Sequence, residues 1–379
     1  MNKKLLSHLD YWLIGAVILL SIFGIICIGS ATHINLGEDP STYYSQILWF
    51  LTGIPLLIIA CIINYKAWSK YYLFFYVFLL LLLVAVLLFG RTANNAKRWL
   101  YLGPIGIQPS EFAKIILIFA LAKLIDRLHD RINQLPVLVF LCAFILLPVA
   151  LIQQQPSLSA SLVLCAILLI ELFVAGISKK YILICLVVAL PLVLLVCLDA
   201  AREDPLLVDH ILAPHQLSRI RTFLRPVEGS NEYYQTFKSI NAIGSGGLTG
   251  KGLYQGTLNQ LSYLPEPHND FIFSVIGEEF GFVGCVAVLA LEYVVAFRCF
   301  LTAMNCRDLF SQLIAAGIGG MFAFQTFVNT GVAVNLLPNT GMSLPFVSYG
   351  GSSMWTNMAA IGLVLNIGAN RAKSIFEEV

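Results

Sequence analysis

Ionisable side chains gather in YLPEPHNDFIFSVIGEEFGFVG (263–284), at the start of a long apolar run. Charged groups are costly in or beside such a run, so their presence there indicates a function. Asp270 lies at the mouth of the run, two residues after His268. A carboxylate at a partly desolvated edge has a raised pKa and suits a general base, whereas an Asp at a helix start also suits an N-cap. The sequence leaves both roles open for Asp270.

A second polar group lies in AKRWLYLGPIGIQPSEFAKI (96–115). Pro109 and Ser110 are typical of a helix start, with Glu111 in the first turn. Lys114 follows inside an apolar stretch, where an unpaired ammonium would be expensive. Because Glu111 and Lys114 are spaced i, i+3, we predict that they pair on one helix face. The pair is either structural or part of the lining of a substrate cavity.

Two uncharged polar segments follow later in the chain. QQQPSLSAS (153–161) carries amides and hydroxyls, which alone are typical of packing between membrane helices. NTGVAVNLLPNTGMSLPFVSYGGSS (329–353) is irregular and punctuated by Pro and Gly. Backbone of that kind is tolerated at membrane depth only where it is buried in protein or lines a cavity.

The longest polar segment, 199–269, contains RIRTFLRP (219–226) and GSGGLTGKG (244–252). The glycine-rich stretch lacks the Gly-x4-Gly-Lys-Ser/Thr spacing of a phosphate-binding loop, and no strand is predicted before it. We interpret it as a flexible outer loop or a re-entrant turn. Apolar side chains before it recur at helical spacing and predict an amphipathic helix that can lie on a membrane. They are Tyr234, Phe237, Ile240 and Ile243.

Composition defines the class of protein. Of the 379 residues, 58% are hydrophobic and only 12% are charged, and the mean hydropathy is +0.82. Continuous apolar runs, without the alternation of a β-barrel, predict an all-α polytopic membrane protein, because a helix satisfies its own backbone in lipid. The net charge of +2 gives no reason to expect a nucleic-acid partner. We interpret the nine Cys as small packing residues.

Apolar runs of about 17–25 residues predict ten membrane spans. They cover residues 11–30, 47–63, 71–89, 110–126, 136–152, 158–176, 181–198, 271–297, 312–334 and 351–368. The first run has the length of a span and shows no small-x-small cleavage site, which favours a retained span over a signal peptide. We expect one membrane domain over residues 1–379, with a large extracytoplasmic loop (about 199–269) between spans 7 and 8.

The distribution of Lys and Arg predicts the orientation. If the amino terminus is cytoplasmic, the inner loops carry basic residues, while the outer loops 31–46, 153–157 and 335–350 contain neither Lys nor Arg. This alternation follows the positive-inside rule and predicts that both termini are cytoplasmic. Loop 90–109 and segment 199–269 depart from the rule. Cations facing outward would suit an anionic ligand such as a lipid-linked phosphate.

Together these motifs resemble the shape, elongation, division and sporulation (SEDS) family of peptidoglycan polymerases. The matching blocks are long and in the family's order: RWLYLGPIGIQPSEFAK, FLRP, AIGSGGLTGKG, LPEPHNDFIFSVIGEEFGFVG and LLPNTGMSLPFVSYGGSS. With the predicted spans, the resemblance covers nearly the whole chain. LLFG (87–90) and AIGSGGLTGKGLYQGTLNQLSYLPE are more similar to the elongation branch of the family than to its division branch.

The resemblance implies glycosyl transfer at the outer face of the bacterial cytoplasmic membrane, where lipid II is polymerised into glycan strands. Asp270, in the family's His-x-Asp-Phe motif, would be the catalytic residue. It would take a proton from the 4-hydroxyl of the acceptor GlcNAc as that oxygen attacks the donor's anomeric carbon, with inversion and loss of the lipid pyrophosphate. Substrate-binding roles are implied for six residues of the matching blocks and for two residues at the position of a further family motif. The six are Arg98, Glu111, Lys114, His268, Ser348 and Tyr349, and the two are Gln155 and Ser157.

Partners and cofactors are also implied by the resemblance. A class B penicillin-binding protein would supply transpeptidation, and further proteins of the elongation complex would join it. No cofactor motif is evident, and a divalent cation, Mg²⁺ or Mn²⁺, is left open.

The chain departs from the family pattern at two positions. The family commonly has Gln-Pro-Asp-Leu-Gly where this chain reads QPSLS (155–159), and it has Asp or Asn where Arg225 stands. The carboxylate missing at Ser157 puts in doubt a role for that site in ion or acceptor binding.

Two other functions stay open at this point. A transporter of the lipid-linked precursor would be expected to keep essential charges near the bilayer midplane, whereas the polar motifs here lie at the outer ends of the spans. A non-catalytic scaffold of a cell-wall complex would not need Asp270.

The predicted topology places residue 230 outside the cytoplasmic membrane. The substitution Ser230→Cys, in a background without reactive cysteines, is expected to react with a membrane-impermeant maleimide in intact cells. Labelling of this position only after lysis would place 199–269 in the cytoplasm and overturn the topology.

Overall fold

Helices dominate the computed structural model, which describes residues 9–33, 39–93, 96–103, 105–202, 208, 214–226, 230–264 and 266–376. Each predicted span corresponds to one helix. These helices are α2 (Tyr11–Ala31), α3 (Ser41–Ile62), α5 (Tyr72–Phe89), α6 (Pro109–Leu128), α7 (Leu135–Gln153), α8 (Leu158–Val174), α9 (Lys179–Ala200), α14 (Ile272–Met304), α15 (Leu309–Ala333) and α16 (Gly351–Phe376).

The class predicted from composition, a polytopic all-α membrane protein, is confirmed. Seven helical segments of the described chain are long and apolar enough to cross a membrane. Three helices at predicted spans fall short of that measure, because α8 has only 17 residues and α6 and α16 are more polar. Two polar side chains of α16 face protein: Asn357 is fully buried, and Asn366 donates to the carbonyl of Ala60 at 2.9 Å. The count of ten spans stays a prediction.

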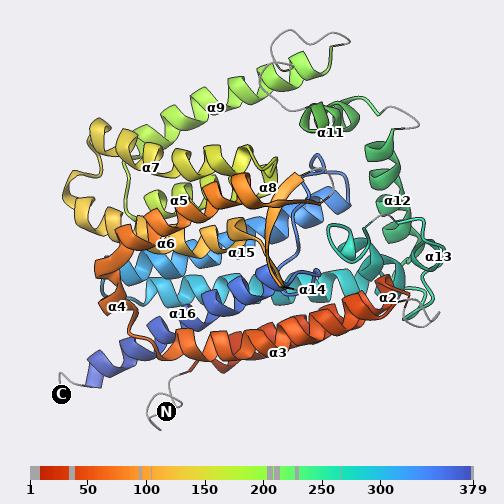
Figure 1. The fold of residues 1–379 in the computed structure, drawn as a ribbon, viewed down its shortest axis with the longest axis horizontal. Coiled ribbons are helices and arrows are strands. Elements are labelled where there is room, and N and C mark those ends of the chain that lie inside the picture. Colours follow the sequence, from red (N-terminus) through yellow and green to blue (C-terminus); the bar gives the residue numbers. More distant parts are fainter. Residues whose placement is uncertain are drawn as a thin grey trace.

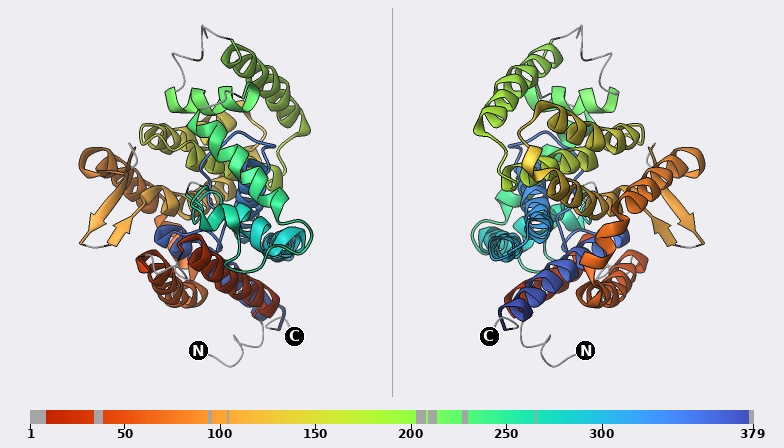
Figure 2. Two further views of the ribbon diagram at one scale, coloured as in Figure 1. Left: turned by 90° about the vertical axis from the view of Figure 1, so that its right-hand side faces the viewer. Right: turned by 90° about the vertical axis from the view of Figure 1, so that its left-hand side faces the viewer.

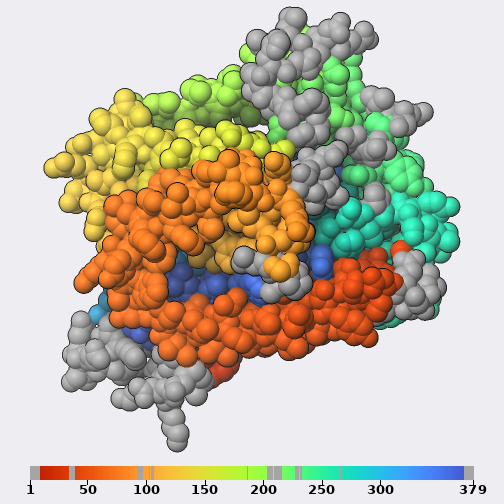
Figure 3. Space-filling model, viewed as in Figure 1, coloured from red at the N-terminus to blue at the C-terminus, as the bar shows by residue number. Residues whose placement is uncertain are grey.

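The long helices run side by side along the longest axis of the molecule (Figure 1). Helix α15 lies at the centre, with 78% of its most apolar window buried, and packs against α14, α8 and α6. Helix α3 packs along α16, which the space-filling view shows only in the strip beside α3 (Figure 3). Helix α9 lies at the margin of the bundle, and none of its window is buried (Figure 2).

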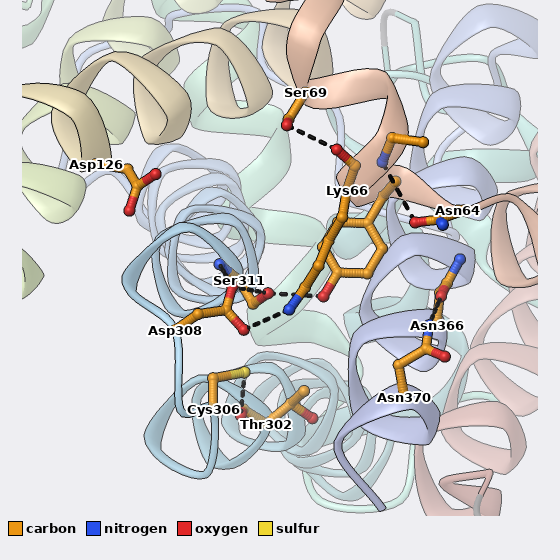
Figure 4. A network of polar contacts seen from close by, with 12 residues as sticks. Asn64, Lys66, Ser69, Asp126, Thr302, Cys306, Asp308, Ser311, Asn366 and Asn370 are labelled. Carbon is orange, nitrogen blue, oxygen red and sulfur yellow. Dashed lines mark hydrogen bonds and ion pairs between the residues drawn. The ribbon is translucent and has the colours of Figure 1, made fainter. Parts of the chain in front are cut away.

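Short elements cover the two ends of the bundle (Figure 1). At one end, α4 (Tyr65–Trp68) is tied to the start of α15. Lys66 pairs with Asp308 at 2.8 Å, and Asp308 caps α15 by accepting from the backbone N–H of Ser311 at 3.1 Å (Figure 4). At the other end lie α11 (Pro214–Leu224), α12 (Asn231–Ser245) and α13 (Thr257–Gln260), and α12 crosses the ends of the long helices.

Loop 90–109 forms a small antiparallel sheet that the sequence patterns did not predict. Its strands are β1 (Arg91–Ala93), β2 (Ala96–Leu102) and β3 (Ile105–Ile107), in the order β1-β2-β3. Two of the strands have only three residues, too few to show an alternating pattern. The sheet packs on α5 and α6 and carries Arg98 in its middle strand.

Helix α14 is interrupted at one residue, Gly281, whose φ of 65° is left-handed. A break frees backbone groups, which need new partners. The glycine-rich turn after α12 supplies them: Phe282 N donates to Gly247 O at 2.9 Å, and Lys251 N donates to Glu278 O at 3.0 Å. We call this contact between 246–252 and 278–283 the glycine clasp.

The glycines of the clasp permit backbone to lie directly on backbone. A Cβ at Gly246 would lie 1.9 Å from the carbonyl oxygen of Gly277, and one at Gly250 would lie 2.2 Å from that of Glu279. A side chain at either position would therefore collide with main chain. Packing, not phosphate binding, accounts for the sequence GSGGLTGKG, which forms a turn packed on α14.

Glu278 and Glu279 hold the segment that follows the clasp. The buried Glu278 carboxylate accepts from the backbone of Leu258 at 2.8 Å and of Asn259 at 3.0 Å, and pairs with Lys251 at 2.7 Å. Glu279 points elsewhere, as expected for adjacent residues, and accepts from the hydroxyl of Ser30 in α2 at 2.5 Å. The two carboxylates thus anchor α13 and α2 to the start of α14.

The clasp predicts a sharp contrast between two neighbouring glycines. Gly246→Ala is expected to destabilise the protein by about 1–3 kcal/mol, because its methyl group meets main chain. Gly244→Ala is the matched control, since a Cβ there meets no atom within 4 Å. Thermal unfolding of the purified protein in detergent measures both, and equal midpoints for the two variants would contradict the clasp.

Candidate functional site

Asp270 occupies the turn that precedes α14 and does not cap that helix. The helix starts at Ile272, its N-cap position is Phe271, and no side chain makes the capping hydrogen bond. The N-cap role left open by the sequence is therefore wrong. Among the described residues, none donates a hydrogen bond to the Asp270 carboxylate, which is partly exposed. The side chain is free to accept a proton.

The backbone around Asp270 is held by the last turns of α15 and by the irregular connection that follows this helix. Asn329 donates through Nδ2 to the carbonyl of Asp270 at 3.0 Å. The hydroxyl of Ser348 donates to the carbonyl of Asn269 at 2.8 Å, and Tyr349 N donates to the carbonyl of His268 at 2.9 Å. Three successive carbonyls thus have fixed partners, and this cradle sets the direction of the Asp270 side chain.

Two guanidinium groups act on the charge of Asp270. Burial raises the pKa of the Asp270 carboxyl, and the neighbouring Glu266 raises it further. The positive charges of Arg219 and Arg98 oppose this and lower the pKa. Asp270 is therefore a carboxylate whose proton affinity is raised by desolvation and held in check by two cations.

Gly341 leaves open the space between the carboxylate and one of these cations. Its φ of 70° is left-handed, a conformation that favours glycine. A Cβ at this position would lie 3.3 Å from Asp270 Oδ2 and 3.6 Å from Arg219 Nη1. The two charged groups therefore face the same point beside Gly341.

Arg98 links the small sheet to the turn between α7 and α8. Its Nε donates to the carbonyl of Gln155 at 3.0 Å, and Nη2 donates to the carbonyl of Pro156. The Gln155 side chain is fully buried and donates to Leu83 O at 3.1 Å. The buried Ser157 accepts through its carbonyl from a hydroxyl in α8. Of this group, the Arg98 side chain reaches Asp270 electrostatically, while Gln155 and Ser157 are packed into the bundle.

The predicted pairing of Lys114 is confirmed. Lys114 Nζ lies 2.7 Å from Glu111 Oε2, and the two side chains are 1% and 15% exposed. Burial makes the pair costly to break, because either partner alone would be an uncompensated charge. The pair lies in the first turns of α6, next to the sheet that carries Arg98.

His268, Tyr349 and Ser348 flank the turn of Asp270 in different ways. The rings of His268 and Tyr349 lie 5.7 Å apart, edge to face. Burial lowers the pKa of His268 more than Glu266 raises it, so the imidazole is neutral at pH 7. The Ser348 hydroxyl is buried and already occupied, since it also accepts from Leu344 N at 2.8 Å. Ser348 is therefore part of the cradle.

Arg219 was not among the residues predicted for the site. It belongs to the quoted motif RIRTFLRP, but that motif contains three arginines, and nothing in their spacing singles one out. The structure singles out Arg219. This residue lies on α11, beside the connection after α15, and its Nη1 donates to Asn339 O at 3.4 Å.

The donor set does not fit a divalent cation held by the protein. In the part of the chain that the structure describes, no three His, Cys, Asp or Glu side chains converge. Asp270 instead has two guanidinium groups near it, Arg219 and Arg98, which supply positive charge opposite the Glu266 carboxylate. The chemistry this site offers is proton acceptance next to two fixed cations.

Comparison with known proteins gives a consistent result over nearly the whole chain. Residues 10–373 match the family FtsW/RodA/SpoVE, described as cell cycle protein. The chain is 35% identical over 373 residues to "Probable peptidoglycan glycosyltransferase FtsW" of Trichlorobacter lovleyi, covering 96% of this chain and 94% of that one. It is 32% identical to the protein of the same description from Bacillus subtilis, with coverage of 97% and 92%.

Solved structures show the same fold. A chain described under "Structural coordination of polymerization and crosslinking by a peptidoglycan synthase complex" aligns with a TM-score of 0.80 at 31% identity, covering 96% of this chain and 98% of that one. The crystal structure of the rod shape determining protein RodA of Thermus thermophilus aligns with a TM-score of 0.68 at 29% identity, covering 96% and 97%.

Proposed function

Because this chain belongs to the FtsW/RodA/SpoVE family, also called SEDS, we propose that it polymerises lipid II into glycan strands. The family predicted from the motifs is confirmed, and the chain is a multi-pass membrane enzyme, a peptidoglycan glycosyltransferase of the bacterial inner membrane. One observation supports the proposed chemistry most directly: Asp270 is a carboxylate without a hydrogen-bond donor among the described residues, and two arginines act on its charge.

Asp270 is the general base in this proposal. Its carboxylate takes the proton from the 4-hydroxyl of the acceptor GlcNAc as that oxygen forms a bond to the anomeric carbon of the donor. The bond between that carbon and the pyrophosphate oxygen breaks, the configuration inverts, and the lipid pyrophosphate leaves. The raised pKa of Asp270 favours proton transfer, since a more basic carboxylate is a better acceptor.

Arg98 and Arg219 stabilise the departing pyrophosphate in this proposal. Preorganised cations aimed at developing negative charge are among the largest contributions to catalysis. Arg98 is held in place by the carbonyls of Gln155 and Pro156. Little free energy is therefore needed to reorganise its side chain during the reaction. The Glu111–Lys114 pair, His268 and Tyr349 are proposed to border the same substrate cavity. Gln155 and Ser157 act through their backbone or through packing, and Ser348 acts through its hydroxyl, which is part of the cradle.

The proposed orientation follows from the Lys and Arg alternation. Ten spans with both termini in the cytoplasm place Asp270 and segment 199–269 on the outer side. The arrangement of elements supports it, because α4 with its basic Lys66 lies at the end of the bundle opposite α12 (Figure 1). The site would then meet lipid II at the outer surface.

We propose elongation, rather than division, as the cellular role. The blocks LLFG and AIGSGGLTGKGLYQGTLNQLSYLPE support it. The curated relatives are described as FtsW, and a RodA structure shares the fold, so family membership alone does not separate the two roles. Depletion of this protein from growing cells distinguishes the two roles. Rounded cells are expected, and filamentous cells would assign the chain to division.

A class B penicillin-binding protein is the proposed partner. Support comes from the structural neighbour described as part of a peptidoglycan synthase complex for polymerization and crosslinking. A transpeptidase bound to this chain would receive glycan strands as they form, together with other proteins of the elongation complex.

Transport of the lipid-linked precursor is the alternative with some structural basis. Glu171 and Glu292 are fully buried in α8 and α14, and each has a carboxylate oxygen without a hydrogen-bond partner among the described residues. However, a Cβ at Gly317 would lie only 2.8 Å from Glu171 Oε1, so this carboxyl is packed tightly against α15. Such packing favours a structural role for Glu171 over a transport path.

Asp270→Asn tests the proposed base. Asn has nearly the same shape but cannot accept the proton, so polymerisation of purified lipid II is expected to fall by about 100-fold or more while the protein stays folded. Asp126→Asn, which removes a carboxylate paired with Lys123 on α6 at the end of the bundle near α4 (Figure 4), is the control and should retain activity. The assay is run with and without the partner transpeptidase. In a separate test, that transpeptidase is expected to co-purify with the chain. Near-parental activity of Asp270→Asn would show that Asp270 is not the base.

A further inference from the structure

Five exposed cations gather at the end of the bundle that carries α4, where α5 and α9 begin and α6 ends (Figure 1). We call them the basic belt: Lys70, Arg127, Arg131, Lys179 and Lys180. None of the five makes an ion pair with another residue in the described part of the chain. Two other lysines at this end differ from them. Lys66 pairs with Asp308 at 2.8 Å, and Lys123 pairs with a carboxylate one turn further along α6 at 2.7 Å. The charges of the belt are therefore available to a ligand.

Packing brings the segments of the belt together. Two short 3₁₀ helices, η2 (Ser69–Tyr71) before α5 and η3 (His129–Arg131) after α6, both contact α6. Asn133 then joins the turn after η3 to the start of α9. Its side chain accepts from Ser178 N at 2.6 Å, and its carbonyl accepts from the Tyr181 hydroxyl at 3.0 Å. The two lysines of the belt on α9 lie between these contacts. The belt thus extends across α5, α6 and α9.

Arg127 is held in position without a carboxylate. Its Nη1 donates to the hydroxyl of Tyr72 at 3.2 Å, and its guanidinium carbon lies 4.9 Å from the centroid of that ring. Tyr72 is buried at the start of α5, so it fixes the guanidinium from the protein side. A guanidinium has five N–H donors, and most of those of Arg127 remain available. Such an arginine suits a phosphate, which can accept two parallel N–H bonds.

Acidic residues offset little of the charge of the belt. In residues 121–134 the carboxylates are Asp126, which is paired with Lys123, and Asp130. Segments 64–72 and 175–182 contain neither Asp nor Glu. The belt therefore sets five positive charges against the single carboxylate of Asp130, which has no ion pair among the described residues. This excess of positive charge favours an anionic ligand.

Exposed apolar side chains beside the belt indicate a lipid as that ligand. Trp68 and Tyr71, which flank Lys70, are 47% and 61% exposed. Trp and Tyr are enriched at the level of lipid headgroups. The first turns of α9 expose Leu183 and Ile184, which belong to a predicted span and so face acyl chains. The belt then lies at the depth of lipid phosphates, where basic side chains attract anionic lipids.

We propose that the basic belt binds the headgroup of an anionic phospholipid in the leaflet at this end of the bundle. The phosphate accepts hydrogen bonds from Arg127 and from cations on either side of it, and the acyl chains lie along the exposed faces of α5 and α9. The lipid thereby joins α9, whose apolar window is not buried in the bundle, to α5 and α6. A lipid with two phosphates, such as cardiolipin, engages more of the belt than a lipid with one. This inference does not rest on the proposed glycosyl transfer.

The test measures lipid binding to the purified full-length protein by native mass spectrometry, with cardiolipin, phosphatidylglycerol and phosphatidylcholine as probes. Cardiolipin is expected to bind the parent most tightly and phosphatidylcholine least. Arg127→Gln/Arg131→Gln is expected to weaken cardiolipin binding by roughly 25-fold, since each cation near an anionic lipid contributes about five-fold. Lys66→Gln/Lys123→Gln is the matched control and should bind like the parent, because it lowers the net charge equally but removes only paired cations.

Several results would overturn the proposal. Equal losses in the two double variants would show a response to net charge alone, and equal binding of cardiolipin and phosphatidylcholine would show that headgroup charge is not recognised. Inorganic phosphate that stabilises the parent against heat as well as cardiolipin does would assign the belt to a free anion. Binding of polyglutamate without binding of cardiolipin would indicate an acidic protein instead. If Arg127→Gln/Arg131→Gln does not fold, Lys179→Gln/Lys180→Gln, which changes only exposed side chains, replaces it, and unchanged cardiolipin affinity in that variant would also contradict the proposal.

Discussion

A helix that breaks within a predicted membrane span needs new hydrogen-bond partners for the peptide groups it frees, and α14 breaks at Gly281. The glycine clasp meets this need with backbone from the turn after α12. The Glu278 carboxylate then fixes the segment that follows, through Lys251 and the start of α13. Because the first turns of α14 are held in this way, the turn just before them, which carries Asp270, has a rigid base.

A second constraint comes from the opposite side of Asp270. The connection after α15 has little regular structure, yet its groups bind the carbonyls of residues 268 and 269, and Asn329 in α15 binds that of residue 270. The helix and the connection hold the backbone of this turn. The Asp270 carboxylate is left without a hydrogen-bond donor among the described residues. Its proton affinity is then decided by the balance between burial, which raises the pKa, and the charges of Arg98 and Arg219, which lower it. The same cations serve the leaving group in the proposed reaction, so one arrangement supports both the base and the departing charge.

Much of this architecture follows from patterns that a sequence displays directly. Apolar run length predicts the helices, and the i, i+3 spacing predicts the Lys114–Glu111 pair. Other features depend on contacts between distant segments, which no local pattern encodes. Two of the three strands in the small sheet around Arg98 are too short to alternate. The choice of Arg219 among three nearby arginines depends on the packing of α11. Gln155 and Ser348 matched family motifs, but their side chains are used for packing and for the cradle. The glycines at 246 and 250 indicate a turn, while their need for close backbone contact is visible only beside α14.

The central claim, that Asp270 is a base whose pKa is held down by Arg219, is tested most directly by the pH dependence of lipid II polymerisation. The reaction needs the carboxylate, so the rate should fall as the pH drops through the pKa of Asp270. Arg219→Gln removes a charge that lowers this pKa, so the acid limb of the profile should move to higher pH, while Arg219→Lys should leave it near the parental position. An acid limb at the same pH in Arg219→Gln and in the parent would contradict the account.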